Sequence, residues 1–169
     1  EPKGVEDAIV ALGIVKKRIP ANLWIVGRGA KQYREYLEKL RSDLHLERDI
    51  VFFDFVSDTK KFELMSRAHI LIHPSIREGF GLTIPEAGFV GTPVVAYSVS
   101  GVRDIVRNME NGILLKHNSP KMIANAVLEL IGDRELYRQI QDKAKQEAKK
   151  FNWDNTARAA LDALVRLKI

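Results

Sequence analysis

The sequence predicts an α/β fold in which a parallel β-sheet carries helices on both of its faces. The first observation behind this prediction is an alternation of strand-length apolar runs with longer segments that follow the helical period. The second is the apolar run at 69–75, which is typical of a strand buried on both faces of a parallel sheet. Together these patterns indicate repeated strand–helix units, which build such a sheet.

Helices in the first half of the chain are expected where apolar residues share one helical face. Segment 4–18 begins the series, with three basic residues in its last turn that complement the helix dipole. Segment 30–44 is a second amphipathic helix, and Asp58 is expected to cap a short helix at 60–66. Another short helix ends near the glycines at 88–91.

Capping residues mark the helices in the last third of the chain. Pro120 is the expected first residue of a helix at 119–131, because its fixed φ and missing N–H suit that position. Asp133 is expected to cap the next helix, which extends to about residue 150.

Strands are expected at the short apolar runs between these helices. A turn at Ser100-Gly101 separates the last two strands, and a final helix is expected from Asn152 or Asp154 to the end. The predicted strands are 22–26, 50–53, 69–73, 93–96 and 112–115.

Composition limits the classes to which the protein belongs. At 169 residues the chain is expected to form one domain, and its 46% hydrophobic and 29% charged residues are typical of a soluble globular protein. It contains no cysteine, which excludes disulfides and thiolate metal sites and suits a reducing, cytoplasmic location. No apolar run approaches 18 residues, so no membrane-spanning segment is expected.

The net charge of +5 has three interpretations. Much of the excess lies in the segment 134–150, and a solvated helix face is the favoured explanation. The alternative is peripheral contact with the inner, anionic face of a membrane. Nucleic acid is not expected as a partner, because no aromatic residues alternate with these lysines, as binding of single strands would require.

A loop with two glycines, residues 77–82, follows the apolar run at 69–75 and precedes a short helix. Glycines allow close approach of the backbone to a ligand, and a helix start offers free N–H groups and positive charge to phosphates. Glu78 and Glu86 flank this segment eight positions apart and are suited to hydroxyl groups. A ligand that carries both phosphates and hydroxyls is a nucleotide sugar.

Each glutamate also has a purely structural interpretation. Thr83 to Glu86 fits a capping box, in which Glu86 would bond back to the Thr83 backbone. Glu78 alone would be interpreted as a solvated loop charge.

Other motifs carry weaker signals. The segment Gly27-Arg28-Gly29 follows a predicted strand, but Gln32 stands where a dinucleotide fingerprint needs its third glycine. The four histidines lack metal-ligand spacing, and no Asp-x-Asp pair is present, so no metal site is expected.

The ordered set of motifs resembles one known family over essentially the whole chain. The pair Glu78 and Glu86 is similar to the E-x7-E signature of the retaining family 4 glycosyltransferases of the GT-B fold. The chain departs from the family pattern at Asp54 and Ser100, where glycines are usual, and an arginine usual before Lys3 is not in the chain. The similar segments are 3–4, 23–29, 74–82, 86–87, 91–96, 111–115 and 151–153.

The resemblance implies a fold and a domain boundary. Residues 1–169 would form the nucleotide-sugar-binding C-terminal domain of a GT-B enzyme, with a doubly wound, Rossmann-like sheet. A strand would precede Lys3 in such a domain, and an N-terminal, acceptor-binding domain would be the partner that this chain lacks.

The resemblance also implies roles for individual residues. Glu78 would contact hydroxyls of the transferred sugar, Glu86 the ribose, and Lys3 the diphosphate, with Glu78 and Lys3 as the catalytic pair. Phe55 and Val56 would lie beside the base. Backbone groups of the loop would contact the sugar and phosphates at Gly79, Phe80, Gly81 and Leu82.

The function expected from this resemblance is the transfer of a hexose, with retention, from a donor such as a UDP- or GDP-sugar to an acceptor hydroxyl. No cofactor and no divalent metal would be needed, and the chain alone would be inactive. The alternatives are half of a GT-B-type nucleotide-sugar epimerase or phosphorylase, and a nucleotide-sugar-binding module without activity.

Overall fold

The computed structural model describes residues 3–152, 154, 157–158 and 161–162. Most of the final helix expected from Asn152 or Asp154, and Trp153 of the segment 151–153, lie outside these residues.

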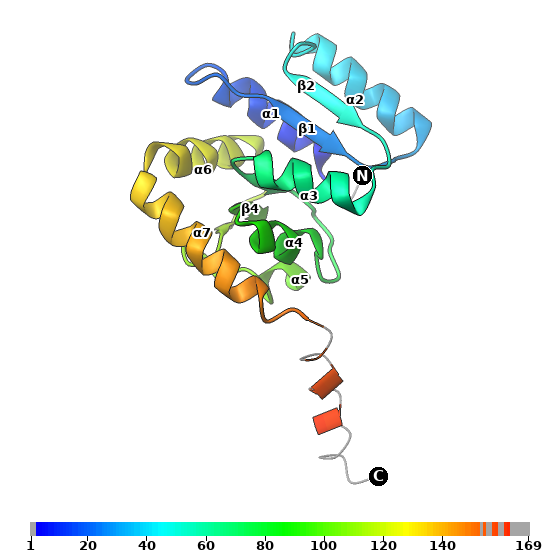
Figure 1. The fold of residues 1–169 in the computed structure, drawn as a ribbon. Coiled ribbons are helices and arrows are strands. Elements are labelled where there is room, and N and C mark those ends of the chain that lie inside the picture. The colour runs from blue at the N-terminus through cyan, green and yellow to red at the C-terminus, as the bar shows by residue number, and fades with distance from the viewer. Residues whose placement is uncertain (1–2, 153, 155–156, 159–160, 163–169) are drawn as a thin grey trace.

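Strands and helices alternate along the chain, which confirms the predicted α/β class (Figure 1). The helices are α1 (Val5–Val15), α2 (Lys31–Asp43), α3 (Asp58–Arg67), α4 (Thr83–Val90), α5 (Ser100–Arg103), α6 (Pro120–Gly132) and α7 (Arg134–Ala148). The strands are β1 (Leu23–Val26), β2 (Ile50–Phe53), β3 (Leu71–His73), β4 (Val94–Tyr97) and β5 (Ile113–Leu115).

The strands pair in parallel, as predicted, but in two hydrogen-bonded groups. One group is β1-β2, with Leu23 opposite Ile50, and the other is β3-β4-β5, with Leu71 opposite Val94. β1 and β3 do not pair with each other; their side chains instead line a cavity of about 1620 Å³ between the two groups. The expected continuous sheet is therefore interrupted between β1 and β3.

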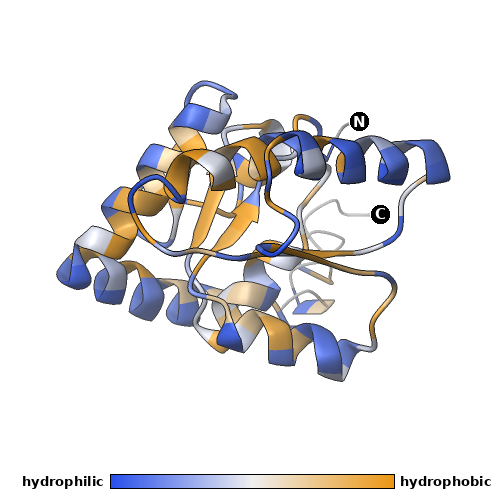
Figure 2. Ribbon diagram, turned by 90° about the horizontal axis from the view of Figure 1, so that it is seen from above, coloured by the Kyte–Doolittle hydropathy of each residue, from blue (hydrophilic) through white to orange (hydrophobic). Residues whose placement is uncertain are grey.

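Helices cover both faces of the larger group, and β4 shows why. Val95 and Tyr97 are fully buried in a cluster with α1, α6 and α7, whereas Val94 and Ala96 are buried against α4 and α5. Successive side chains of a strand point to opposite faces, so a strand with helices on both sides must be apolar at every position. Figure 2 shows the strands as hydrophobic and the outer helix surfaces as hydrophilic.

Helix α1 connects the two groups of strands. Ile9 and Leu12 pack with Leu37 and Ile50 beside the first group, while Ala11 lies in the cluster around β4 and β5. Apolar residues cover enough of its circumference for α1 to pack against two partners at once.

Three local predictions are corrected by the structure. Ser57, not Asp58, caps α3: its side chain accepts a hydrogen bond from Lys60 N at 3.2 Å, and Asp58 is the first helical residue. The expected turn at Ser100-Gly101 is the short helix α5. Helix α1 ends at Val15, so the basic residues 16–18 follow it as a turn.

Two capping predictions are confirmed. Pro120 opens α6, and the Asp133 side chain accepts hydrogen bonds from Glu135 N and Leu136 N, both at 3.0 Å. The predicted basic helix is α7, in which Lys143 pairs with Glu147, and Lys150, just after the helix, pairs with the same carboxylate. This internal pairing neutralises part of the excess charge and favours the solvated-face interpretation of that helix.

Within the described residues, no helix is both long and apolar enough to cross a membrane.

Candidate functional site

Glu78 is the centre of a cluster at the carboxyl end of β3. Its Oε2 atom lies 2.8 Å from Lys3 Nζ and 3.3 Å from His73 Nε2, and its Oε1 atom accepts a hydrogen bond from Gly79 N at 3.2 Å. The side chain is only 14% exposed. The Lys3 ammonium lowers the pKa of Glu78, with a smaller contribution from His73. Glu78 is therefore a held carboxylate and not a solvated loop charge.

Lys3 reaches this cluster because Gly4 allows a close backbone contact. Gly4 has a left-handed φ of +61°, and a Cβ atom there would lie 2.2 Å from the carbonyl oxygen of Pro74. Only glycine fits this position, which joins the start of α1 to the end of β3. The two predicted catalytic residues are thus brought together.

Glu86 occupies the first turn of α4 and contacts α3. Its Oε1 atom accepts a hydrogen bond from Lys61 Nζ at 2.7 Å, and Lys61 also pairs with Asp58 at 3.1 Å. The hydrogen bond to Glu86 raises the pKa of Lys61. Lys61 was not among the residues predicted for the site, because in the sequence it is one lysine within a run of charged residues.

The capping-box interpretation of Glu86 is not supported. Leu82 is the N-cap residue of α4 and Thr83 is its first helical residue, without a side-chain cap bond. The Glu86 carboxylate points to another helix instead, so its position is set by a tertiary contact.

The glycine loop, residues 77–82, presents its backbone close to α5. Gly81 has a φ of +79°, which glycine adopts without strain. A Cβ atom at Gly101 would lie 2.2 Å from the carbonyl oxygen of Gly79, so Gly101 allows α5 to support the loop. The Phe80 ring packs edge-on against Phe151 at 5.7 Å, and Leu82 is exposed.

The loop after β2 lies near the loop after β1. Phe55 is 78% exposed, and the Arg28 guanidinium lies 6.0 Å from the centre of its ring. Val56 is half-buried, and Asp54 pairs with Arg34 at 3.9 Å. An exposed aromatic ring next to an arginine can stack on a planar group such as a base.

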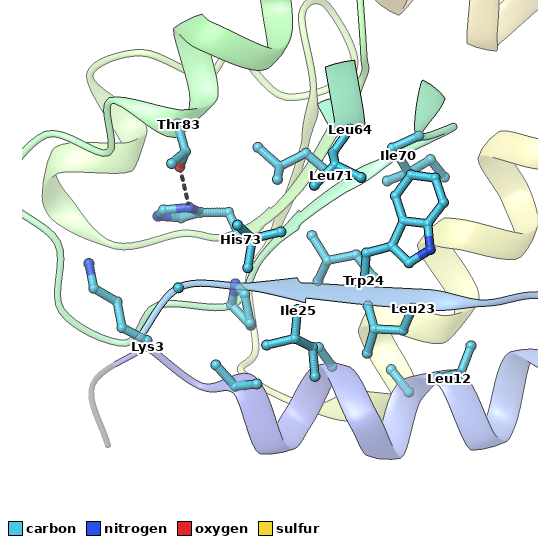
Figure 3. Close-up of a pocket in the computed structure, with 18 of the residues that line it drawn as sticks. Lys3, Leu12, Leu23, Trp24, Ile25, Leu64, Ile70, Leu71, His73 and Thr83 are labelled. Atoms are coloured by element: carbon cyan, nitrogen blue, oxygen red, sulfur yellow. Dashed lines mark hydrogen bonds between the residues drawn. The ribbon is translucent and has the colours of Figure 1, made fainter. Parts of the chain in front are cut away.

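One cavity joins most of these positions, and Figure 3 shows its two ends. The polar end carries Lys3, His73 and Thr83, and the apolar end carries side chains of β1 and β3 with Leu64 and Leu12. Of the predicted site residues, Gly79, Glu86, Phe55 and Val56 do not line this cavity, although Lys61, the partner of Glu86, does. The predicted residues that line it are Lys3, Glu78, Phe80, Gly81 and Leu82.

The described part of the chain contains no group of three or more histidine, cysteine, aspartate or glutamate residues that could hold an ion. The positive charge near Glu78 comes from Lys3 and from the start of α4.

Comparison with known proteins identifies the relatives of this chain. The sequence profile of the family described as glycosyl transferases group 1 matches residues 1–147. An uncharacterised glycosyltransferase from Methanocaldococcus jannaschii is 34% identical over 161 residues, which are 95% of this chain and 41% of the relative. The chain thus spans about two fifths of the length of this curated relative.

Two solved structures are similar to the fold. HepE from Anabaena in complex with UDP matches 98% of this chain and 46% of its own, with 27% identity and a TM-score of 0.87. The C-terminal domain of LpcC, a glycosyl transferase group 1 family protein from Francisella tularensis, matches 89% of this chain and 80% of its own, with 26% identity and a TM-score of 0.78.

Proposed function

This chain belongs to the family of group 1 glycosyl transferases, and from this premise we propose that residues 1–169 are the donor-binding, C-terminal domain of a retaining GT-B enzyme. The whole enzyme transfers a hexose from a nucleoside diphosphate sugar to an acceptor hydroxyl, and an N-terminal domain outside this chain binds the acceptor. The observation that carries the proposal is the contact of Lys3 with Glu78 beside the glycine loop and the start of α4.

In this reaction the bond between the anomeric carbon and the diphosphate breaks, the acceptor oxygen bonds to that carbon, and the proton of the acceptor hydroxyl passes to the departing diphosphate. Negative charge develops on the departing diphosphate. In this proposal, Lys3, the backbone N–H groups at 79–82 and the positive end of α4 stabilise it.

Donor binding requires Lys3 to exchange partners. Its ammonium turns from Glu78 to the diphosphate, and the position it leaves on Oε2 becomes available to a hydroxyl of the sugar. One ion pair in the free protein is thus replaced by two contacts to one ligand.

The nucleoside is held at a second place. Lys61 fixes one oxygen of Glu86, and the other can accept hydrogen bonds from ribose hydroxyls. Phe55 and Val56 lie beside the base. HepE was solved with UDP and with UDP-glucose, which supports uridine as the first nucleoside to test.

A panel of UDP-, GDP- and ADP-sugars in a thermal shift assay on the full-length protein would identify the donor. Incubation with the selected donor in labelled form then tests transfer. Failure of every nucleotide sugar to bind would overturn the proposed function, and binding without turnover would leave a binding module.

Substitutions of the two glutamates should have different effects on the ligand affinities measured by calorimetry. Glu78→Ala should spare the nucleoside diphosphate and weaken only the nucleotide sugar, whereas Glu86→Gln should weaken both. A hydrogen bond to a charged group contributes about 1.5–3 kcal/mol, so each loss should be about tenfold to a hundredfold. Glu110→Ala, in an exposed turn, is the matched control and should change neither affinity. Equal loss of both ligands in Glu78→Ala would refute the sugar assignment.

We further propose that no cofactor and no divalent metal take part, because Lys3 and the start of α4 supply the positive charge beside the phosphates. A chelator should leave donor affinity and transfer unchanged. Loss of binding with chelator and its recovery with Mn²⁺ would contradict this.

Transfer should require the complete enzyme, since a cleft needs both domains to exclude water. Residues 1–169 alone should bind the donor weakly and transfer nothing.

Peripheral membrane contact through the basic residues of α7 would appear as cosedimentation of the full-length protein with anionic vesicles.

A further inference from the structure

His73 is a buried polar residue with no role in the reaction described above. It is the last residue of β3 and is 8% exposed, and its ring lies beside Gly81 of the glycine loop and Thr83 at the start of α4. Its Nδ1 atom is 3.3 Å from Thr83 Oγ1, a contact drawn in Figure 3, and its Nε2 atom is 3.3 Å from Glu78 Oε2.

The Nε2 atom is buried yet makes no hydrogen bond of regular geometry. An unsatisfied buried polar group destabilises the folded state, so the position of this nitrogen beside Glu78 requires a reason. A leucine would fill the end of a buried strand without this cost.

The surroundings determine what His73 can donate. Burial lowers the pKa of His73 below its ordinary value of 6.5; Glu78 opposes this shift and Lys3 adds to it, and the net lowering favours the neutral ring at neutral pH. A neutral imidazole has one N–H donor and one acceptor nitrogen. If Thr83 donates its hydroxyl hydrogen to Nδ1, the remaining N–H lies on Nε2 and faces Glu78.

We propose that His73 is a positioning residue for Glu78, and that its Nε2–H keeps the carboxylate in place when Lys3 turns to the diphosphate. Lys3 and His73 contact the same oxygen of Glu78, at 2.8 Å and 3.3 Å. Once Lys3 has left, the Nε2–H of His73, 3.3 Å away, can donate to this oxygen, and the freed lone pair accepts from a sugar hydroxyl. Thr83 fixes the ring from its other nitrogen. The inference rests on the proposed function, since it assigns His73 to the sugar contact of Glu78.

The test uses calorimetry on the full-length protein, with the nucleotide sugar selected by the panel and its matching nucleoside diphosphate. His73→Leu should weaken the nucleotide sugar by roughly threefold to tenfold, the range of one hydrogen bond, and leave the nucleoside diphosphate unchanged. His73→Gln keeps an N–H donor in a side chain of similar reach and should restore most of the affinity. The control is His69→Leu, the same substitution at an exposed position just before β3.

A double substitution distinguishes positioning of Glu78 from a general effect on the fold. In a Glu78→Ala background, His73→Leu should cause no further loss of nucleotide-sugar affinity. If His73→Leu does not fold, Thr83→Val replaces it, because it removes the hydroxyl partner of Nδ1 with little change of shape.

The outcomes separate this inference from the proposed function. Suppose that Glu78→Ala weakens only the nucleotide sugar. If His73→Leu then weakens neither ligand, or weakens both equally, the role of His73 alone is overturned. An unselective or absent effect of Glu78→Ala overturns the sugar assignment itself, and the role of His73 with it. An additive loss in the double substitution would also refute positioning through Glu78.

Discussion

Lys3 Nζ lies 2.8 Å from Glu78 Oε2 although the two residues are 75 positions apart in the chain. The residue proposed for the diphosphate and the residue proposed for the sugar therefore neutralise each other in this structure. In the proposed function, Lys3 exchanges Glu78 for the diphosphate when the donor binds, and the freed oxygen of Glu78 takes a sugar hydroxyl.

Removal of the Lys3 charge should change both the affinity for the nucleoside diphosphate and the pKa of Glu78. In Lys3→Met the affinity for the nucleoside diphosphate should fall by about tenfold, since a charged hydrogen bond of about 1.5 kcal/mol or more is lost. The Lys3 ammonium lowers the pKa of Glu78, so in the variant that pKa should rise toward its ordinary value of 4.5. Calorimetry and carboxyl NMR titration measure the two effects. Lys17→Met, at an exposed lysine after α1, is the control, and an unchanged Glu78 pKa in Lys3→Met would contradict the prediction.

Lys61 should act through Glu86. Lys61→Met frees the Glu86 carboxylate to change rotamer, so nucleoside diphosphate and nucleotide sugar should weaken equally, by roughly threefold to tenfold. The adjacent Lys60→Met is the matched control, because Lys60 pairs with Glu63 and not with Glu86. Titration of both ligands against both variants gives the answer, and equal behaviour of the two lysine variants would disprove the role of Lys61.

His73 should make stability depend on pH. Burial is the main cause that lowers its pKa, Lys3 adds to this, and Glu78 opposes it. Because the folded value is lower than the unfolded value of 6.5, the unfolded chain binds the proton more readily. The contribution of the neutral His73 ring to the free energy of unfolding is fully present above pH 6.5. It is lost as the pH falls through the lowered pKa of the folded state. Between about pH 7.5 and pH 5 the Tm of the wild type should fall further than the Tm of His73→Gln. An equal fall in Tm for the two proteins would contradict this prediction.

The two capping positions before α6 and α7 should differ in their effect on stability. The Asp133 side chain bonds two N–H groups of α7, whereas the Ser119 side chain makes no cap hydrogen bond. Asp133→Ala should cost about 1 kcal/mol, which lowers the Tm of a protein of this size by about 2–4 °C. Ser119→Ala should have little effect. A similar Tm for the two variants would show that the Asp133 cap is not formed in solution.

The gap between β1 and β3 should be filled in the full-length protein by the strand expected before Lys3. Leu23 and Leu71 direct their amides to β2 and β4, so by alternation the amides of Trp24 and Ile72 face the cavity. In site-resolved hydrogen exchange these latter two amides should be protected in the full-length protein and should exchange rapidly in residues 1–169. Leu23 and Leu71 should be protected in both and serve as internal controls. Rapid exchange of Trp24 and Ile72 in the full-length protein would exclude such a strand.

The sequence by itself determined the fold class and, apart from the short helix α5, the order of the described elements. Apolar runs at β2 and β4 and the caps at Pro120 and Asp133 were sufficient, because period and capping are local properties of the chain. The pair Glu78 and Glu86 was also identifiable, because Glu78 lies in the glycine loop and Glu86 in the first turn of the helix that follows it, so their spacing is a local property of the sequence. The family followed from the ordered motifs and was confirmed by the match to residues 1–147.

Only the tertiary structure decided which partner each carboxylate has. Glu86 fits a capping box by spacing, yet it pairs with Lys61 on another helix, because a charged side chain at a helix start takes the closest cation that packing provides. His73 looked like an ordinary residue of a buried strand, and only the meeting of β3, the glycine loop and α4 places it beside Glu78. Gly4 and Gly101 gain their importance from backbone contacts with Pro74 and Gly79. Such contacts join distant parts of the chain, and no local pattern records them.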